Sequence, residues 1–588
     1  MRNHDLADLL EEIADLLEIQ EANVFRIRAY RRGAEQVGNL AEEAVAALEA
    51  GRKIAGIGTD LAAKILEAAR TGRIEYLEEL RAAVPRGVRQ MMHLPGVGPR
   101  RARLLHEKLG AVSIDDLERE IASGRILEIA GFQKKSAENL KKGIDSWRAG
   151  RSRTLLARAL GIAQGLMEAL REDPAVLRIE IAGSLRRRVE TVGDIDLLAA
   201  STNPGTVMER FATLPQVREV IARGDTKCSV VLREDLQVDL RVVEPGAFGA
   251  ALQYFTGSKG HNIRLRELAV RRKLKVNEYG VFDESGARLA GETEESLYAA
   301  LGLPWIPPEI REDGGEIEAA LAGRLPRLVE TADIKGELHA HTDWTDGRAP
   351  LEDLVAAAES KGYEYLVVSD HSRSTTIARG LTPERVLEQV RAIRALQPRH
   401  RIRILTGSEC DILPDGTMDF PDEILAQLDF VLAAVHSRFK QPREEMTARV
   451  CRALENPYVR VLVHPTGRLI NSRESYELDL EKVLQTAKAH GKAVEINSSP
   501  NRLDLRDVHA RRARDLGLLL SIDTDTHHLR ELDNIHLGVA TARRAWIGPE
   551  QVLNAMPLER LLAWTGGGDG SRSAAGGRLP PAKGTAPP

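Results

Sequence analysis

The alternation of apolar strands and helical segments from residue 335 to about 565 constrains the fold of this chain more than any other feature. Helical segments such as 351–360 and 478–490 separate short apolar segments. Strict alternation of strand and helix is typical of a parallel βα barrel, because each parallel strand needs a crossover before the next. We therefore predict a distorted (β/α)7 barrel over residues 335–566. Its seven strands are expected near residues 336, 364, 402, 429, 459, 493 and 518.

Histidines and acidic residues recur at or just beyond the C-terminal ends of these predicted strands, in the segments HAH, SDH, GSE, VHS, VHP and DTH. A βα barrel gathers those strand ends around one mouth, so the side chains should converge. The candidate ligands are His339, His341, Asp346, His371, Glu409, His436, His464, Asp525 and His527. Nine ligands are too many for one four- or five-coordinate ion, so two or three metals are expected. Such a site usually hydrolyses a phosphate ester.

Composition places the chain among multidomain proteins of a reducing compartment. Its 588 residues exceed what one hydrophobic core organises, and about three to five domains are expected. The three cysteines are far apart and have no CxxC spacing, which excludes a disulfide scaffold and a thiolate zinc finger. The acidic amphipathic N-terminus and the lack of an apolar run of about 18 residues argue against secretion and membrane insertion. We expect a cytoplasmic protein.

Changes in pattern along the chain predict the domain organisation. Residues 1–150 have helical periodicity throughout, strands begin only after them, and a helical and loop region runs from 246 to about 315. The tail is rich in Gly, Ala, Ser and Pro and is expected to be disordered. The predicted divisions are helical domains at 1–85 and 86–150, an α+β domain at 151–245, a further domain at 246–315, a linker at 316–334, the barrel at 335–566 and the tail at 567–588.

Three aspartates in the middle of the chain predict a second site for divalent metals. Asp194 and Asp196 stand two residues apart on a predicted strand, so both carboxylates point to one face of the sheet. Asp239 can join them from a neighbouring strand. An Asp-x-Asp pair alone is usually a solvated strand face, but three clustered carboxylates can hold two Mg²⁺ ions for in-line phosphoryl transfer.

A glycine-containing turn before these aspartates predicts a phosphate site. Gly183 and Ser184 end a predicted strand at the start of a helix, where backbone N–H groups can hold phosphate. Arg187 adds a charged clamp, and Gly193, directly before the aspartate pair, completes the predicted nucleotide-binding segment. Together with the carboxylates, these residues predict a site for a nucleoside triphosphate.

Two turns near the N-terminus predict contacts with DNA phosphates. The segments IAGIGTDLAAKI and LPGVGPRRARLL place glycines 56 and 58, and 96 and 98, directly before a helix. Such a turn exposes backbone N–H groups without a side chain in the way, which is the helix-hairpin-helix pattern. A weaker version at 129–140 lacks the second glycine, and packing explains it as well. One copy could be an ordinary turn between helices, but two copies favour DNA binding by Gly56, Gly58, Gly96 and Gly98.

The aspartate pattern resembles the nucleotidyltransferase superfamily, and the segment YFTGS at 254–258 is similar to the thumb of family X DNA polymerases related to DNA polymerase beta. The resemblance implies that Tyr254 and Phe255 lie against the incoming sugar, with Gly257 beside them. It also implies that Asn262 contacts the base and that Arg266 contacts the templating nucleotide.

The same resemblance makes Asp239 the carboxylate nearest the primer 3′-OH. Gln237 stands where the animal polymerases have an arginine. The first eighty residues resemble the lyase domain of DNA polymerase beta, which implies DNA contacts by Arg26, Tyr30 and Arg31 in the segment FRIRAYRRGA.

Lys64 matches the Schiff-base lysine of that lyase domain. Such a lysine needs a lowered pKa to attack an abasic sugar. Asp60 lies one helical turn before Lys64, where a second basic residue is usual, and its carboxylate would raise the pKa of the lysine. Lys64 is therefore either a Schiff-base lysine or a DNA-binding surface lysine.

The barrel motifs resemble the polymerase and histidinol phosphatase (PHP) domain, which implies a trinuclear site. Imidazole-rich ligation favours Mn²⁺, Zn²⁺ or Fe²⁺ over Mg²⁺. The expected ligands of one ion are His339, His341, Glu409 and Asp525; those of a second are Glu409 and His436; those of a third are Asp346, His371, His464 and His527. In bacterial members the domain is associated with 3′ to 5′ exonuclease and abasic-site cleavage. Arg438 and Arg468 could steer the phosphate backbone or be solvated surface residues.

Together with these motifs, the resemblance implies a DNA-directed DNA polymerase that fills short gaps in base excision repair or end joining and processes 3′ ends in its barrel. Its expected partners are gapped or primer-template DNA and dNTPs, without a membrane, and the chain is expected to act as a monomer. Three alternatives remain. The barrel could be mainly structural or regulatory, it could be a small-molecule phosphatase, or the central domain could add nucleotides without a template.

Overall fold

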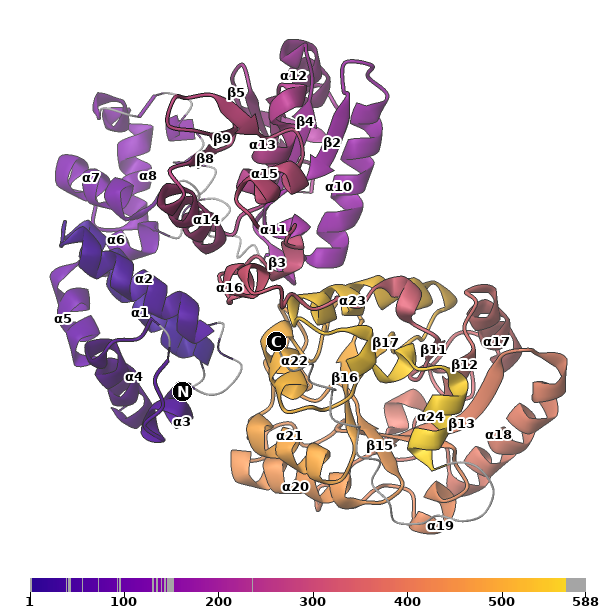
Figure 1. Ribbon diagram of the computed structural model, residues 1–588. Helices are drawn as coiled ribbons and strands as arrows, with labels where there is room; N and C mark the ends of the chain where they lie inside the picture. Colours follow the sequence, from indigo (N-terminus) through magenta and orange to yellow (C-terminus); the bar gives the residue numbers. More distant parts are fainter. Residues whose placement is uncertain are drawn as a thin grey trace, which may run out of the picture. The chain divides into compact units, whose positions relative to one another are not determined.

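The computed structural model describes residues 3–566 apart from 39, 41–43, 55, 72, 93, 95–96, 130–131, 134–135, 139, 142–143, 145–152 and 235. The chain forms two compact units (Figure 1). The first comprises residues 1–153 with 219–223, and the second residues 154–218 with 224–588. The expected tail at 567–588 lies outside the described residues. None of the described helices is both long and apolar enough to cross a membrane.

The first unit is helical along its main segment, as expected, and its amphipathic helices share one core. Leu10, Ile13, Ile65, Val88 and Leu105 are fully buried in that core. Its helices are α1 (Asn3–Ile19), α2 (Val24–Gly38), α3 (Ala44–Glu49), α4 (Thr59–Thr71), α5 (Glu75–Ala83), α6 (Arg86–Met91), α7 (Pro99–Leu109), α8 (Ile114–Ala122) and the 3-10 helix η1 (Arg125–Glu128).

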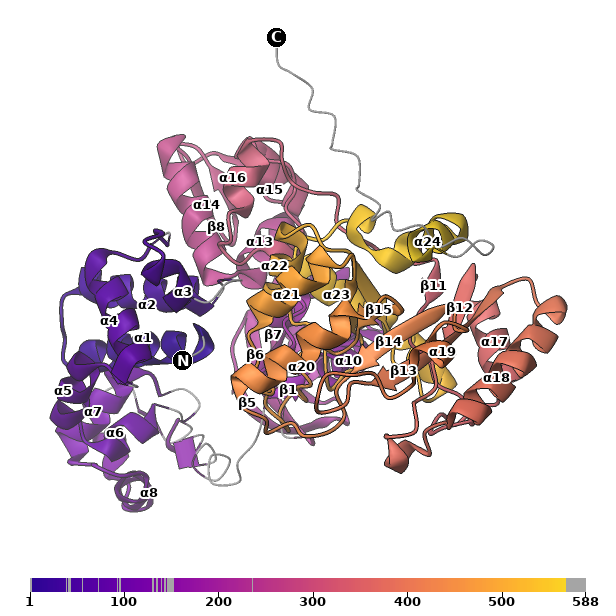
Figure 2. The same ribbon diagram turned by 90° about the horizontal axis from the view of Figure 1, so that it is seen from below.

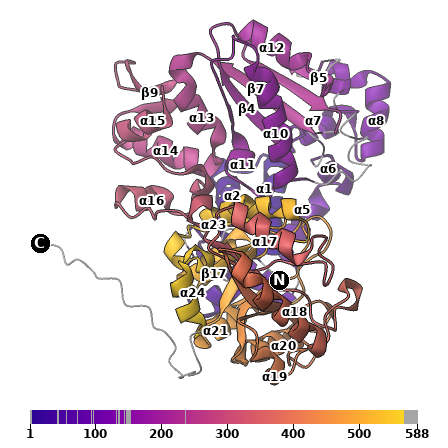
Figure 3. The same cartoon turned by 90° about the vertical axis from the view of Figure 1, so that its right-hand side faces the viewer.

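The second unit begins with a mixed sheet that presents the three aspartates. Four of its strands are ordered β2-β4-β7-β6, with β4 and β7 parallel and the outer pairs antiparallel. Helices α10 and α12 pack against the sheet (Figure 3). The elements are β1 (Thr154–Leu155), α10 (Leu156–Arg171), β2 (Arg178–Ile181), α11 (Gly183–Arg186), β3 (Thr191–Val192), β4 (Asp194–Ala200), α12 (Pro204–Ala212), β5 (Val217–Arg223), β6 (Lys227–Leu232) and β7 (Gln237–Val243).

The segment after this sheet contains a small sheet that the sequence did not predict. Strands β10, β9 and β8 pair antiparallel, and each has three residues, too few for an alternating pattern to be visible. The elements are η2 (Pro245–Ala247), α13 (Phe248–Thr256), α14 (Lys259–Arg271), β8 (Lys275–Asn277), β9 (Gly280–Phe282), β10 (Arg288–Ala290), α15 (Glu294–Ala300), η3 (Pro308–Ile310), α16 (Glu316–Leu321) and η4 (Thr331–Asp333).

The predicted barrel is confirmed: seven parallel strands pair in chain order from β11 to β17. A parallel bridge between Ala340 and Thr526 brings the segments after the first and last strands together and nearly closes the sheet. The strands are β11 (Gly336–Glu337), β12 (Tyr365–Val368), β13 (Arg403–Asp411), β14 (Phe430–Ala434), β15 (Val459–Leu462), β16 (Ala493–Asn497) and β17 (Leu520–Asp523).

Helices surround these strands (Figure 2). They are α17 (Leu351–Ser360), η5 (Thr376–Ala378), α18 (Pro383–Leu396), η6 (Gln397–Arg399), α19 (Asp422–Leu425), α20 (Arg443–Glu455), α21 (Leu480–Ala489), α22 (Asp507–Asp515), η7 (Leu529–Asn534), α23 (Ile535–Arg544), η8 (Pro549–Gln551), η9 (Leu553–Ala555) and α24 (Leu558–Thr565). The strands are buried along almost their whole length, as expected of a parallel sheet covered by helices.

Candidate active sites

The pairing of β4 with β7 brings the three predicted aspartates together. Asp196 is the direct partner of Asp239 in this parallel pair, and Asp194 is two residues away on the same face of β4. Burial and the neighbouring charges of Asp194 and Asp239 raise the pKa of Asp196 to about 6. The three carboxylates therefore repel one another when all are ionised. Divalent cations would balance their combined negative charge.

Asp239 has partners of its own. Lys227 Nζ lies 2.5 Å from Asp239 Oδ2, and Gln237 Nε2 donates to Asp239 Oδ1 over 3.0 Å. Burial raises the pKa of Asp239, but Lys227 and the hydrogen bonds outweigh it and bring the pKa below its usual value. Sequence reasoning did not identify Lys227, because a lysine in an ordinary strand has no motif.

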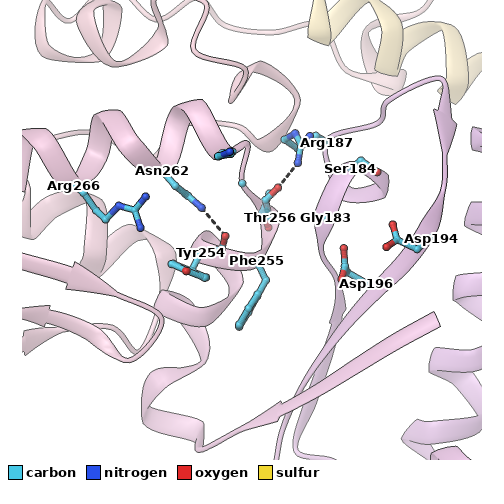
Figure 4. Close-up of a pocket in the computed structure, with 12 residues that line it drawn as sticks. Gly183, Ser184, Arg187, Asp194, Asp196, Tyr254, Phe255, Thr256, Asn262 and Arg266 are labelled. Atoms are coloured by element: carbon cyan, nitrogen blue, oxygen red, sulfur yellow. Dashed lines mark hydrogen bonds between the residues drawn. The ribbon is translucent and has the colours of Figure 1, made fainter. Parts of the chain in front are cut away.

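A cavity of about 420 Å³ opens beside Asp194 and Asp196 (Figure 4). Its lining, the polymerase pocket, consists of Gly183, Ser184, Arg187, Asp194, Asp196, Tyr254, Phe255, Thr256, Gly257, Lys259, Asn262 and Arg266. Most of the predicted nucleotide-binding residues thus line one pocket. Thr256, which stands in the predicted thumb segment but was given no role, and Lys259, which the sequence did not single out, also line it. Gly193 and Asp239 are not among the lining residues. Gly193 is exposed directly before β4.

A glycine is required at the phosphate turn for two reasons. Gly183 has a φ of +60°, and a Cβ there would lie 2.1 Å from Asp196 Oδ2. The short helix α11 that starts at Gly183 therefore comes directly against the carboxylate strand. This close approach is the physical reason for the order Gly-Ser followed by Asp-x-Asp.

Hydrogen bonds hold the other side of the polymerase pocket. Asn262 Nδ2 donates to the Tyr254 carbonyl oxygen over 2.7 Å (Figure 4). Gln253 Nε2 donates to Asn262 Oδ1 over 2.7 Å. Phe255 packs edge-on against Tyr254 and faces the guanidinium of Arg241. Thus Asn262 is oriented before any nucleotide binds, with its amide fixed at both ends.

The nine predicted metal ligands, here called the histidine cluster, converge at the C-terminal mouth of the barrel. Glu409 is central: its Oε1 lies 2.7 Å from His464 Nε2 and 3.2 Å from His436 Nε2. Its Oε2 lies 3.6 Å from His341 Nε2. Asp346 Oδ1 lies 3.5 and 3.3 Å from the Nε2 atoms of His371 and His527. Ligands of one metal at ~2.1 Å are themselves ~3.0–3.5 Å apart, so most of these separations suit shared ions.

The buried polar atoms of the histidine cluster fit a metal centre. Among the residues that the structure describes, His339 Nε2, both ring nitrogens of His341, Asp346 Oδ1 and Glu409 Oε2 are buried without a hydrogen-bond partner. Burying such groups unsatisfied is costly, and a bound cation would satisfy them. The donor set fits Mn²⁺, Zn²⁺ or Fe²⁺.

The structure changes the expected grouping of one ligand. His464 was expected beside Asp346, His371 and His527, but its ring groups with His339 and Asp525. The third group is completed instead by His341, which lies with Asp346, His371 and His527. The reason is topological: His464 follows β15, which lies three strands beyond β12, the strand that His371 follows.

Two buried carboxylates lie behind the histidine cluster, and the sequence did not single them out. Glu495 Oε1 lies 2.7 Å from His339 Nδ1, and Asp411 Oδ1 lies 2.7 Å from His436 Nδ1. Each can accept from Nδ1, which leaves Nε2 free to face a metal. Glu495, an acid inside the apolar strand AVEIN, was a visible signal, because an acid at such a position needs a partner.

The guanidinium of Arg468 already has partners within the protein. It binds Glu190 over 2.7 Å and is largely buried, so the suggested contact with the phosphate backbone does not fit. Arg438 is exposed after β14. Arg502, which the sequence did not single out, lies with its Nε 3.6 Å from Asp525 Oδ2.

The first unit contains the described part of the glycine turns. Gly56 has a φ of +79°, and Gly58 directly precedes α4 with open space where a Cβ would be. Gly98 caps α7 and is equally open. Gly96 lies outside the described residues, as do several residues of the weaker segment at 129–140. The geometry at Gly56, Gly58 and Gly98 leaves the helix starts accessible to a phosphate.

The predicted DNA contacts on α2 divide into two kinds. Arg26 is exposed and lies over the ring of Tyr76, so it can reach DNA. Tyr30 is only 1% exposed and belongs to the core, and Arg31 forms ion pairs with Glu11, Asp15 and Glu18. The geometry therefore favours structural roles for Tyr30 and Arg31, because their polar groups already have partners within the unit.

Lys64 is held as an ammonium. Its Nζ lies 2.5 Å from Asp60 Oδ1. Burial lowers the pKa of Lys64, but Asp60 and Tyr30 outweigh it, so the pKa rises above its usual value. A protonated amine cannot attack an abasic sugar, and the geometry opposes a Schiff-base role.

The fold and the two sites define a class: a nucleotidyltransferase joined to a barrel built for metal-dependent hydrolysis of phosphate esters. The comparisons with protein families agree. The DNA polymerase beta thumb profile matches residues 251–312, the PHP domain profile 337–499, and two helix-hairpin-helix profiles 1–74 and 88–146.

A curated relative covers nearly the whole chain. The DNA polymerase/3′-5′ exonuclease PolX of Bacillus subtilis (strain 168) is 38% identical over 568 residues, which is 96% of this chain and 99% of that protein. This chain therefore belongs to the family X DNA polymerases that carry a PHP domain. Probable phosphatases of Thermoanaerobacter sp. (strain X514) and Acetivibrio thermocellus are 30% and 32% identical over 163 and 167 residues, covering 26% and 28% of this chain and 64% of each protein.

Proposed function

We propose that this family X polymerase fills short gaps in DNA with the polymerase pocket and trims 3′ ends with the histidine cluster. The observation that carries the first half is the pairing of Asp196 with Asp239 beside a pocket of nucleotide size. Asp194, Asp196 and Asp239 would hold two Mg²⁺ ions, which stabilise the attacking and leaving oxygens of an in-line displacement.

The pocket residues would bind and orient the dNTP. The backbone N–H groups at the start of α11 and the cations of Arg187 and Lys259 face the triphosphate. Tyr254 and Phe255 pack against the sugar, while Asn262 and Arg266 touch the base pair. The fixed amide of Asn262 favours template-directed synthesis over template-independent addition, because it reads the position of a paired base.

The histidine cluster would hold up to three Mn²⁺ or Zn²⁺ ions, which supply Lewis acidity and a water of lowered pKa for hydrolysis of a phosphodiester. The unsatisfied buried atoms support this role over a purely structural barrel. The exonuclease in the name of the Bacillus subtilis relative favours DNA as substrate over a small molecule. Cleavage at abasic sites extends the same chemistry, and base excision repair or end joining would use both sites.

The helical first unit would bind the DNA substrate. The backbone of gapped or primer-template DNA would be contacted by Gly56, Gly58, Gly96, Gly98 and Arg26. The domain divisions would be those predicted from the sequence. Lys64 would contribute charge and no lyase activity. Because the proposed substrate is chromosomal DNA, we expect the protein to act in the cytoplasm. Because one chain contains all the proposed site residues, we expect it to act as a monomer.

Two substitutions test the proposal on one substrate, a gapped duplex labelled at the 5′ end of the primer and incubated with Mn²⁺, with or without dNTPs. Asp239→Ala should lower primer extension by about 10³-fold or more and leave primer shortening within twofold, because it removes one carboxylate of the polymerase site. His341→Ala should do the reverse.

Each variant serves as the folding control for the other, because each keeps one activity. Loss of both activities in either variant would contradict two independent sites. Unchanged shortening in His341→Ala would leave the barrel as a structural module.

A further inference from the structure

Two arginines of the barrel bind the turn that carries Arg187. This turn connects α11, the phosphate helix, to β3, and β3 leads directly to Asp194. Arg544, the last residue of α23, donates from Nη1 to the Arg187 carbonyl oxygen over 2.8 Å. Arg468 binds the far end of the turn at Glu190, with Nη2 2.7 Å from Oε2. The turn is therefore fixed from the barrel at both ends.

A chain of alternating charges leads from the barrel into the polymerase pocket. Glu312 Oε1 accepts from Arg187 Nε and from Arg544 Nη1, each over 2.9 Å. Arg544 Nε also donates to Asp507 Oδ2 over 2.8 Å. At the other end, Arg187 Nη1 donates to the Thr256 carbonyl oxygen over 2.5 Å. The side chains of these four charged residues are only 13% to 26% exposed, so solvent screens them weakly.

The surface between the barrel and the residues around Glu312 is a packed interface. Trp546, two residues after Arg544, is 8% exposed and belongs to the same core as Ile310 and Ile317. Arg543 binds Glu309, with Nε 2.7 Å from Oε1. Because this apolar packing lies next to the charged chain, it limits the movement of the charged partners.

We propose that Arg544 is a positioning residue for nucleotide binding: the barrel, through Arg544 and Glu312, sets the place and the effective charge of Arg187. The inference rests on the proposed contact of Arg187 with the triphosphate. Arg544 shares the carboxylate of Glu312, which leaves part of the Arg187 charge available to an anion. Without Arg544, Glu312 is left to Arg187, and the turn loses its bond at the Arg187 carbonyl oxygen.

The helix offers a matched control, because Arg543 and Arg544 are neighbours at the same interface but bind different acids. Single-nucleotide incorporation into gapped DNA gives KM and kcat for the dNTP. Arg544→Ala should raise KM by about 3- to 10-fold with kcat within about twofold, the pattern of lost binding rather than lost chemistry. Arg543→Ala should leave KM within twofold. Manganese-dependent primer shortening and the melting temperature report whether each variant folds.

Two further variants separate positioning from a loosened interface. Arg544→Lys retains a cation but cannot bind Asp507, Glu312 and the Arg187 carbonyl together, so its KM should fall between those of the wild type and Arg544→Ala. Adding Glu312→Gln to Arg544→Ala should return KM toward the wild-type value, because the carboxylate that neutralises Arg187 is gone. If Arg544→Ala folds poorly, the Arg544→Lys series gives the same comparison.

The Arg187→Ala variant distinguishes the two levels of the proposal. An unchanged KM in Arg187→Ala would contradict the proposed nucleotide contact itself. A raised KM in Arg187→Ala together with an unchanged KM in Arg544→Ala would overturn only the positioning role. Equal effects of Arg543→Ala and Arg544→Ala, or no rescue by Glu312→Gln, would also overturn it.

Discussion

Two acids, Asp196 of the polymerase pocket and Asp525 of the histidine cluster, have pKa shifts of opposite sign. Burial and two neighbouring carboxylates raise the pKa of Asp196 to about 6. Burial also raises the pKa of Asp525, but His339, His341 and His527 outweigh it, and the pKa lies well below its usual range. Asp196 is thus dominated by neighbouring carboxylates, whereas Asp525 is dominated by neighbouring imidazoles.

If both proposed metal sites are occupied, this difference would separate metals that arrive with a substrate from metals that reside in the protein. Oxygen-only ligation by a half-open pocket suits Mg²⁺, which keeps several waters and is shared with the phosphates of the dNTP. Buried imidazoles with carboxylates behind them suit a softer ion held throughout the cycle. A single chain could therefore carry out primer extension and primer shortening in the same solution of divalent cations.

The largest expected effect comes from removing the carboxylate at the centre of the histidine cluster. Glu409→Gln should lower Mn²⁺-dependent primer shortening by about 10³-fold, because Glu409 belongs to two of the candidate ligand groups. Elemental analysis after dialysis should show less bound metal than in the wild type. Asp194→Asn should abolish extension without changing that metal content. Equal metal loss in both variants would remove the distinction between resident and arriving ions.

A smaller effect is expected from the carboxylate behind the cluster. Asp411→Asn keeps the shape of the side chain but removes the charge that His436 faces, so metal affinity should fall by about 10- to 100-fold. Competition with a fluorescent chelator measures this affinity directly. Asp415→Asn, on the exposed turn after β13, is the matched control. An affinity unchanged in Asp411→Asn would show that Nδ1 of His436 needs no charged acceptor.

Local spacing and strand alternation made the barrel, the convergence of the histidine cluster and the clustering of the three aspartates predictable. The strand starts agree within two residues because each apolar run ends at a polar motif. The grouping of His464 was wrong because it depends on where each ring points inside the mouth. The contacts of Glu312 and Arg544 were not predictable either, since each depends on a partner far away in sequence. The contact of Lys227 depends on the pairing of two neighbouring strands. Three-residue strands such as β8 are too short to show a period.

Gly183 and Arg31 mark the limits of motif reasoning. Position 183 requires glycine for a local reason, because its turn closely approaches Asp196. The motif therefore has the same structural meaning in this chain. Arg31 matches a DNA-binding segment by position, yet its guanidinium binds three acids of α1. A motif fixes which residue stands at a position, and packing decides whether its polar group is available.

The smallest expected effect tests the opposite pKa shifts directly, as stability in EDTA. Asp196 has a folded pKa above the usual 3.8, so the folded protein binds more protons than the unfolded chain between pH 3.8 and about 6. The free energy of unfolding therefore decreases as pH rises through this interval, and the penalty is fully present above pH 6. Asp196→Asn should raise the stability at pH 7.5 by about 1–3 kcal/mol and change it little at pH 4.

Asp525→Asn should have the opposite sign. Its lowered pKa contributes stability that is present above pH 3.8 and is lost as pH falls, so removing the charge should destabilise the metal-free protein at pH 7.5 by about 2–4 kcal/mol. Thermal melts followed by circular dichroism at both pH values measure the two effects. Destabilisation by Asp196→Asn at pH 7.5 would mean that the neighbouring carboxylates do not destabilise the ionised form of Asp196. The contrast between Asp196 and Asp525 would then fail.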